Sequence, residues 1–181
     1  MKEIDKIAER FKRGDKSAFE EIYEQFAKKV YNLALRYCRD AQAAEDIAQE
    51  SFIRVYRHID SYNEDYSFSA WMMKIVVNLC ISHRKSQSKD MQKVINYQEV
   101  KRNVSNDPAA RIEINDIIQH YLEQLDDISK MMTTLYYIQD FTYEEISEIM
   151  ECPIGTVKSR LSRAKEKFHE MVSKKKEGNV Q

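Results

Sequence analysis

The amino-acid sequence predicts an all-α protein with two small helical domains joined by a flexible linker, the second domain ending in a helix-turn-helix. Only 3 Gly and 2 Pro occur among 181 residues, while strong helix formers are plentiful. Apolar residues recur at intervals of three and four in several segments, which is the period of one buried helix face. This pattern fades over residues 86–111, where polar side chains prevail, so a linker with at most a transient helix near 91–102 is expected there.

The first domain, residues 1–85, is expected to contain four helices that bury one core. They are expected over about residues 2–13, 17–38, 41–59 and 68–84, with a polar loop over 60–67. The second of these segments follows the 3.6-residue period throughout, and Ser17 with Glu20 offers it a capping box. Asp40 is suited to cap the third helix, because its carboxylate can accept from free backbone N–H groups.

The second domain, residues 112–181, is expected to close with the helix-turn-helix. Two helices precede that motif, over about residues 112–125 and 129–139. The first helix of the motif carries a capping box formed by Thr142 and Glu145. Phe141 and Ile146 flank this cap at the spacing of a hydrophobic staple, which fixes the angle at which the chain enters the helix.

The second helix of the motif is expected to begin at Pro153, which suits a first helical position, with Cys152 as its cap. Its apolar face consists of Ile154, Val157, Leu161, Ala164 and Phe168. The remaining positions are basic or hydroxyl-bearing, namely Lys158, Ser159, Arg160, Ser162, Arg163 and Lys165. Such side chains suit phosphates and base edges, and the second helix of this motif usually enters the major groove of DNA. An ordinary helical hairpin is the alternative, but cap, staple, short turn and basic helix agree on a helix-turn-helix.

The net charge is only −1, but the charges are unevenly distributed. Residues 152–181 carry eight bases and three acids (+5), and residues 66–102 carry seven bases and two acids (+5). Residues 112–151 carry ten acids and one base (−9), and residues 40–65 carry seven acids and two bases (−5). Basic segments indicate a polyanionic partner and acidic ones a protein partner, although charge alone leaves solvated helix faces open as an alternative.

Other classes of protein are disfavoured by what the sequence lacks. No apolar run approaches the roughly 20 residues of a membrane-spanning helix, and the N-terminus has no apolar signal region, so no direct membrane insertion is expected. Cys38, Cys80 and Cys152 form no C-x-x-C pair, which predicts neither a zinc site nor disulfides, and a reducing cytoplasm is the expected location. We find no metal-spaced cluster, phosphate-binding loop or nucleophile–base pair; hence no metal, no cofactor and no catalytic residue are expected, and a nuclease or other enzyme is disfavoured.

Two sets of motifs, in the same order, resemble those of a known family. Residues 155–164, Gly-Thr-Val-Lys-Ser-Arg-Leu-Ser-Arg-Ala, resemble a bacterial RNA polymerase sigma factor of the extracytoplasmic-function (ECF) group, group IV of the sigma-70 family. Independently, Ala-Glu-Asp-Ile-Ala-Gln-Glu-Ser-Phe at 44–52 resembles the polymerase-binding segment of this family, and Phe-Ser-Ala-Trp at 68–71 its promoter-melting segment. The resemblance covers roughly residues 15–85 and 112–172.

The resemblance implies that the first domain binds core RNA polymerase and reads the −10 promoter element as an opened single strand. Its polymerase-binding positions are Asp46, Gln49 and Glu50, whose acidity suits a basic partner surface; the helix macrodipole alone would explain an acid at 46. Its −10 positions are Ser61, Tyr62 and Asn63 on the loop and Asn78 on the following helix, and the cations Lys74, Arg84 and Lys85 on or after that helix are suited to hold phosphates. The Asn78 amide can donate and accept at once, which suits a base edge. For Trp71, the spacing favours a place in the core over stacking on a base.

The second domain is implied to read the duplex −35 element. The matching positions are Thr156, Lys158, Ser159, Arg160, Ser162 and Arg163. Arg160 is expected to read a base, since arginine selects guanine through two hydrogen bonds. Ser147 departs from the family, in which Ala is usual at this close contact between helices.

The function implied is promoter-specific initiation of transcription, in response to stress or an envelope signal. No inhibitory region is expected before the first helix, so the resemblance implies restraint by another protein, a membrane-anchored anti-sigma factor. The runner-up is a helix-turn-helix repressor or activator that binds duplex DNA alone, usually as a dimer. That alternative leaves the first domain and its single-strand positions unexplained.

Overall fold

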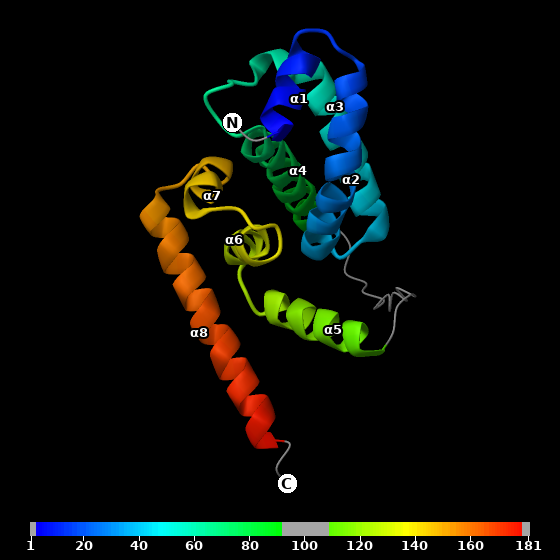
Figure 1. Ribbon diagram of the computed structural model, residues 1–181. Coiled ribbons are helices and arrows are strands. Elements are labelled where there is room, and N and C mark those ends of the chain that lie inside the picture. The colour runs from blue at the N-terminus through cyan, green and yellow to red at the C-terminus, as the bar shows by residue number, and fades with distance from the viewer. Residues whose placement is uncertain (1–2, 92–108, 179–181) are drawn as a thin grey trace.

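The computed structural model describes residues 3–91 and 109–178, and over these residues it is helical and contains no strand (Figure 1). The all-α prediction is therefore confirmed. The elements in chain order are α1 (Glu3–Lys12), α2 (Ser17–Cys38), α3 (Ala41–His58), the 3-10 helix η1 (Ile59–Ser61), α4 (Phe68–Met91), α5 (Ala109–Glu123), α6 (Asp127–Tyr137), α7 (Tyr143–Ile149) and α8 (Ile154–Gly178). Within the described part of the chain, none of these helices is long and apolar enough to cross a bilayer.

Helix α2 is the centre of the first domain, which comprises α1 to α4, because it contacts each of the other three helices. Its inner face, formed by Ile22, Phe26, Val30 and Leu33, is at most 4% exposed. Phe26 meets Phe68, the first residue of α4, edge to face with ring centroids 6.0 Å apart. The 3.6-residue period thus predicted the bounds of α2 and most of its buried face, but Tyr23, which it also assigned to that face, is 51% exposed.

Of the helix caps predicted for α2 and α3, one is confirmed and one is wrong. The Asp40 side chain accepts from the Ala43 backbone N at 3.0 Å, so the predicted cap of α3 is confirmed. The predicted capping box of Ser17 and Glu20 is wrong. Asp15 Oδ1 accepts instead from both the backbone N (3.1 Å) and the Oγ (2.6 Å) of Ser17, so the cap comes from two residues earlier.

The linker prediction is wrong at both ends, because helix continues into it from each side. α4 runs to Met91, and α5 begins at Ala109, so residues 86–91 and 109–111 are helical. Polar composition does not end a helix that has no Gly or Pro in its path. The remainder of the predicted linker, with most of its transient helix, lies outside the described residues.

In the second domain, α5 to α8, the long helix α8 packs on both α6 and α7. Asp126 caps α6 by accepting from the backbone N of Ile128 (3.2 Å) and of Ser129 (3.1 Å). Further along α8, the hydroxyl of Tyr121 on α5 donates to the Ala164 carbonyl at 2.6 Å. The bond from Tyr121 ties α5 to α8.

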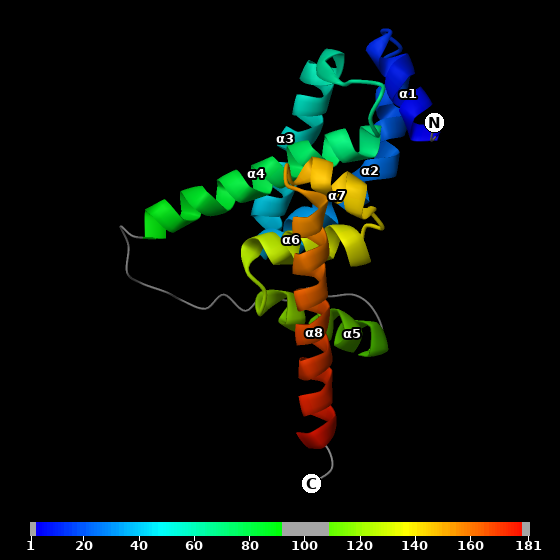
Figure 2. The same cartoon turned by 90° about the vertical axis from the view of Figure 1, so that its left-hand side faces the viewer.

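The two domains pack against one another, with α7 against α4 and α6 against α2 (Figures 1 and 2). One apolar cluster continues through both of them: buried Met131, Met132 and Leu135 of α6 and Ile146 and Ile149 of α7 belong to the same cluster as the core of the first domain. The sequence predicted a core within the first domain but not this continuation.

Candidate nucleic-acid interface

The first helix of the helix-turn-helix forms as its sequence predicts. Thr142 Oγ1 accepts from the Glu145 backbone N at 3.2 Å, and Glu145 Oε2 accepts from the Thr142 backbone N at 3.0 Å, so the capping box is confirmed. Phe141 and Ile146 are both buried, as a hydrophobic staple requires.

The turn between α7 and α8 is tight and hydrogen-bonded. Glu151 has a left-handed backbone, with φ of 49°, and the Ser147 Oγ donates to the Cys152 carbonyl at 2.6 Å. Ser147, which departs from the family pattern, therefore ties α7 to the turn that leads into α8. The predicted cap is wrong by one residue: α8 begins at Ile154, and the first helical bond runs from the Val157 N to the Pro153 carbonyl at 3.3 Å, so Pro153 occupies the cap position.

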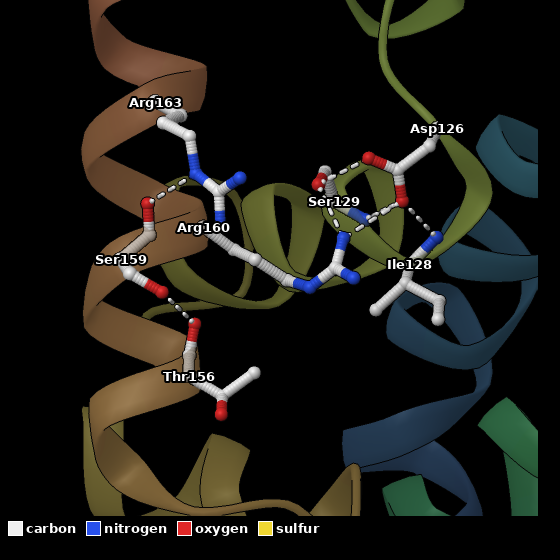
Figure 3. A network of polar contacts seen from close by, with 7 residues as sticks. All are labelled: Asp126, Ile128, Ser129, Thr156, Ser159, Arg160 and Arg163. Carbon is white, nitrogen blue, oxygen red and sulfur yellow. Dashed lines mark hydrogen bonds and ion pairs between the residues drawn. The ribbon is translucent and has the colours of Figure 1, made fainter.

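Helix α8 presents a basic and hydroxyl-bearing face to solvent. Val157, Leu161 and Ala164 are buried. Of the predicted −35 positions, Lys158, Ser159, Ser162 and Arg163 are exposed, and Thr156 is partly exposed. Ser159 Oγ donates to the Thr156 carbonyl at 3.0 Å, and Arg163 Nε donates to the Ser159 carbonyl at 3.2 Å, so Arg163 lies along the helix surface (Figure 3).

Arg160 differs from its neighbours, and its predicted role as a base reader does not fit its position. Its side chain reaches from α8 to the start of α6, where Nη1 lies 3.0 Å from Asp126 Oδ1 and 3.1 Å from Ser129 Oγ (Figure 3). A guanidinium that is engaged in this way positions α8 against α6. Burial alone would raise the Asp126 pKa, but hydrogen bonds from Ser129 and the charge of Arg160 outweigh it and hold that pKa below its ordinary value.

Four predicted −10 residues lie on α4. Asn78 and Lys85 are exposed, whereas Lys74 and Arg84 are partly buried. Lys74 Nζ lies 2.6 Å from Glu151 Oε1, and Arg84 Nη1 lies 3.1 Å from Asp127 Oδ1. Both cations are therefore paired with carboxylates of the second domain.

The loop before α4 is anchored to α1 at two points. Lys12 Nζ donates to the Tyr62 carbonyl at 2.7 Å, and Asp5 Oδ1 accepts from the Phe68 backbone N at 3.0 Å. Ser61 and Asn63 are exposed on this loop, and Asn63 Oδ1 accepts from the Asp65 N at 3.0 Å, which is an Asx-turn.

Tyr62 is the predicted −10 residue that does not fit direct contact with DNA. Its side chain is only 1% exposed, and its hydroxyl donates to the Tyr66 carbonyl at 2.9 Å. Burial raises its pKa to about 12. Trp71 packs on it and on Phe68, with ring centroids 5.6 and 5.7 Å away, in keeping with a packing role for the indole.

One of the three predicted polymerase-binding residues lines a groove between α2 and α3. Asp46 and Gln49 are exposed and Glu50 is partly exposed, with Arg54 Nε 2.7 Å from Glu50 Oε1. Gln49 lines the groove, which has a volume of about 780 Å³. Asp46 and Glu50 do not line it, so only one of the three predicted residues faces this hollow.

Sequence reasoning missed the aromatic lining of this groove. Tyr23, Ile53 and Tyr56 are 51%, 43% and 45% exposed, although each is large and apolar. The sequence carried one signal, which is the concentration of aromatic side chains on this helix pair: Phe19 and Tyr23 on α2, and Phe52 and Tyr56 on α3. Exposed apolar patches of this kind mark sites of protein–protein contact.

Family models match both domains. The model described as sigma-70 region 2 matches residues 22–90, and that described as sigma-70 region 4 matches residues 115–168. Among curated relatives, the ECF RNA polymerase sigma factor SigW of Bacillus subtilis is 32% identical over 90% of this chain and 93% of its own length. The ECF RNA polymerase sigma-E factor of Escherichia coli strain K12 is 33% identical over 88% of this chain and 89% of its own length.

Solved structures share the fold. CnrH, in complex with the cytosolic domain of CnrY, aligns with a TM-score of 0.71 at 20% identity, over 93% of this chain and 96% of its own. The sigma factor RpoE of Bartonella quintana, in complex with the anti-sigma factor NepR, aligns with a TM-score of 0.73 at 21% identity, over 86% of this chain and 96% of its own.

The contacts of Asp126 predict which of two substitutions raises its pKa more. A depressed pKa in the folded state means that these contacts stabilise the fold above the unfolded pKa, and that this contribution is lost as pH falls through the folded pKa. Ser129→Ala removes only the hydroxyl bond to Asp126 and keeps the backbone bond, and it should raise the Asp126 pKa more than Arg160→Ala does, because that hydroxyl bond lowers the pKa more than the charge of Arg160. Carboxyl ¹³C NMR titration of both variants measures the two shifts, and the reverse order would contradict the assignment.

Proposed function

This chain belongs to the extracytoplasmic-function group of bacterial sigma-70 factors, and from that premise we propose how its parts divide the work. As a sigma factor, it directs core RNA polymerase to promoters and so sets where transcription initiates. The first domain takes the role of region 2 and the second that of region 4. Phosphodiester bond formation belongs to the polymerase, in the cytoplasm, and this chain supplies recognition without catalysis.

For the −35 duplex, we assign the exposed face of α8. Lys158, Ser162 and Arg163 reach bases and phosphates in the major groove, with Thr156 and Ser159 on phosphates near the start of the helix. Arg160 is a positioning residue, since its guanidinium is held by Asp126 and Ser129 and fixes the angle of α8.

For the opened −10 strand, we assign the loop and α4. Ser61, Asn63 and Asn78 offer exposed hydrogen-bonding groups for base edges. The cations Lys74, Arg84 and Lys85 lie along the same helix and suit the phosphates of a single strand. Buried Tyr62 supports the loop from within.

For polymerase, we assign the groove between α2 and α3 together with its acidic neighbours. The aromatic lining supplies apolar area, while Asp46, Gln49 and Glu50 supply polar contacts and charge opposite to a basic partner surface.

We further propose an anti-sigma protein as the partner that restrains this chain until a stress or envelope signal arrives. Support comes from RpoE of Bartonella quintana, a structural neighbour that is found with such a partner. Membrane anchoring of that partner is an expectation of the same proposal. Co-purification of the chain with a membrane fraction, lost after partner removal, is the expected outcome; permanent association with polymerase alone would contradict it.

The observation that carries the proposal is that one chain contains a helix-turn-helix with an exposed basic face and a separate helical domain that matches sigma-70 region 2. Run-off transcription with purified core polymerase on genomic fragments should give discrete starts only when this chain is added. A repressor or activator would instead bind duplex DNA tightly on its own and would not change the start sites of core polymerase.

Replacing the two arginines of α8 should give different results. Arg163→Ala should cost about 1–3 kcal/mol of binding and relax specificity at one −35 position, because an exposed base contact is lost. Arg160→Ala should lower binding uniformly across sequences and reduce thermal stability, since α8 loses its tie to α6. Holoenzyme binding to a library of single-base −35 variants distinguishes them; loss of specificity at one position in Arg160→Ala would return it to base reading.

Substitutions on the two assigned surfaces of the first domain should affect different steps. Asn78→Ala should impair promoter opening but leave core polymerase affinity unchanged, because this side chain is exposed on α4. Gln49→Lys should do the opposite and weaken core binding by about tenfold, near 1.4 kcal/mol, through a positive charge against a basic surface. Fluorescence anisotropy with labelled core and permanganate footprinting give the two readouts. An equal effect of Asn78→Ala on both would assign Asn78 to the polymerase contact.

A further inference from the structure

The loop of residues 61–67, here called the −10 loop, is tied at both ends to α1. Helix α1 contacts η1, which leads into the loop, and α4, which follows it (Figure 1). At the first end, the Lys12 ammonium donates to the Tyr62 carbonyl at 2.7 Å. At the second end, Asp5 Oδ1 accepts from the Phe68 backbone N at 3.0 Å. One helix therefore fixes where the loop begins and where it ends.

Helix α1 is a firm support for the loop, because it is itself packed into the core of the first domain. Its apolar side chains Ile4, Ile7, Ala8 and Phe11 are at most 9% exposed. Asp5 is 8% exposed, so water competes little for the bond between its carboxylate and the start of α4. The position of α1 is thus transmitted to the loop.

The internal bonds of the −10 loop give it a shape but do not attach it to a helix. Asn63 Oδ1 accepts from the Asp65 N at 3.0 Å, and the Tyr62 hydroxyl donates to the Tyr66 carbonyl at 2.9 Å. The Tyr62 ring packs on the Phe68 ring, with centroids 5.4 Å apart, but apolar attraction has little directional preference. The two bonds from α1 involve charged groups and supply that direction.

The bond from Lys12 acts where the loop is expected to read DNA. Tyr62 lies between Ser61 and Asn63, the two exposed side chains assigned above to base edges, so a shift of its carbonyl moves both neighbours. The same ammonium lies 3.3 Å from Glu64 Oε1 and so engages the loop a second time. Accurate placement matters here, because a hydrogen bond weakens steeply as its angle departs from the preferred range.

From these contacts we infer that Asp5 and Lys12 of α1 are positioning residues for −10 recognition: they hold the −10 loop in the geometry in which Ser61 and Asn63 meet a base. This role rests on the proposed function, because it takes those two side chains as −10 contacts. Helix α1 precedes residues 22–90, which the sigma-70 region 2 model matches, so that match assigns it no role.

Substitution of Lys12 tests this role, with Arg13 as the control. Lys12→Met keeps an unbranched apolar stem but removes the ammonium that donates to the Tyr62 carbonyl. Arg13→Met removes the next cation, which is 75% exposed and pairs with Glu9 of α1. Both variants lose one positive charge near the C-terminal end of α1, so effects of net charge or of the helix macrodipole are common to them. Lys12→Arg is the conservative variant, because it retains donors.

The readout is the selectivity of holoenzyme between a promoter found by run-off transcription on genomic fragments and its single-base −10 variants. Lys12→Met should lower the preference for the parent −10 sequence by about tenfold, as expected for the loss of one charge-assisted hydrogen bond. Selectivity at −35 and affinity for core polymerase should not change. Lys12→Arg should retain most of the −10 preference, and Arg13→Met should retain all of it.

Two results would overturn the positioning role of Lys12. One is an unchanged −10 preference in Lys12→Met. The other is an equal loss in Lys12→Met and Arg13→Met, which would show an effect of charge alone. Thermal unfolding followed by circular dichroism verifies that each variant is folded at the assay temperature.

Asp5 provides an independent test at the other end of the loop. Asp5→Asn keeps a side-chain oxygen that can accept from the Phe68 backbone N, whereas Asp5→Ala keeps none. The −10 preference should therefore fall further in Asp5→Ala than in Asp5→Asn. Parent-like preference in a folded Asp5→Ala would contradict the role of Asp5. If Asp5→Ala is unfolded at the assay temperature, the Lys12 variants decide.

Initiation by the parent chain separates this role from the proposed function. If the parent chain and core polymerase give no discrete starts, the proposed function fails. If the parent chain gives discrete starts and Asn63→Ala loses −10 preference while Lys12→Met keeps it, the loop reads the −10 element without help from α1. In that case only the positioning role fails. Loss of −10 preference in both variants, with both folded, supports the role.

Discussion

The arrangement of this chain depends on the burial of α6 on all sides. Seven consecutive residues, 129–135, are buried, which no helix on the surface of a two-layer domain achieves. α6 contacts α5, α7 and α8 within its own domain and α2 of the other. If the first domain were removed, the side of α6 that α2 covers would face water. The second domain therefore needs a partner surface, and here the first domain provides it.

The packing of the two domains buries a charged group as well as apolar side chains. Lys130 of α6 is only 4% exposed, and its pKa is lowered, first by burial and then by the charge of Arg84. A buried ammonium opposes this packing, because burial removes its hydration. The free energy gained by burying apolar side chains and the free energy lost by burying Lys130 oppose each other at the boundary between the two domains.

Local sequence features predicted local structure well. Asp40 and Thr142 cap their helices as predicted, since a cap depends on residues two or three positions away. The predicted capping box at Ser17 is wrong because the carboxylate of Asp15, two residues earlier, accepts from the Ser17 backbone N. The covering of Lys74 and Arg84 could not be predicted, because it depends on which surfaces meet across residues far apart in the chain. The aromatic groove was indicated by composition, but periodicity assigned Tyr23 to the core.

Arg160 and Arg163 show why a motif alone does not assign roles on a helix. Both are arginines of the same basic stretch, three residues apart, which is 300° of rotation at 100° per residue and so about 60° between their directions. Val157, Leu161 and Ala164 define the buried side, and Arg160 lies at its margin, within reach of the α6 cap. Arg163 lies further round, beyond that reach, and its guanidinium follows the outer surface. A cation at the margin of the core can bond to the neighbouring helix, whereas a cation beyond the margin is exposed to solvent. The position of Asp126 at the start of α6, which no feature of α8 reveals, decides between them.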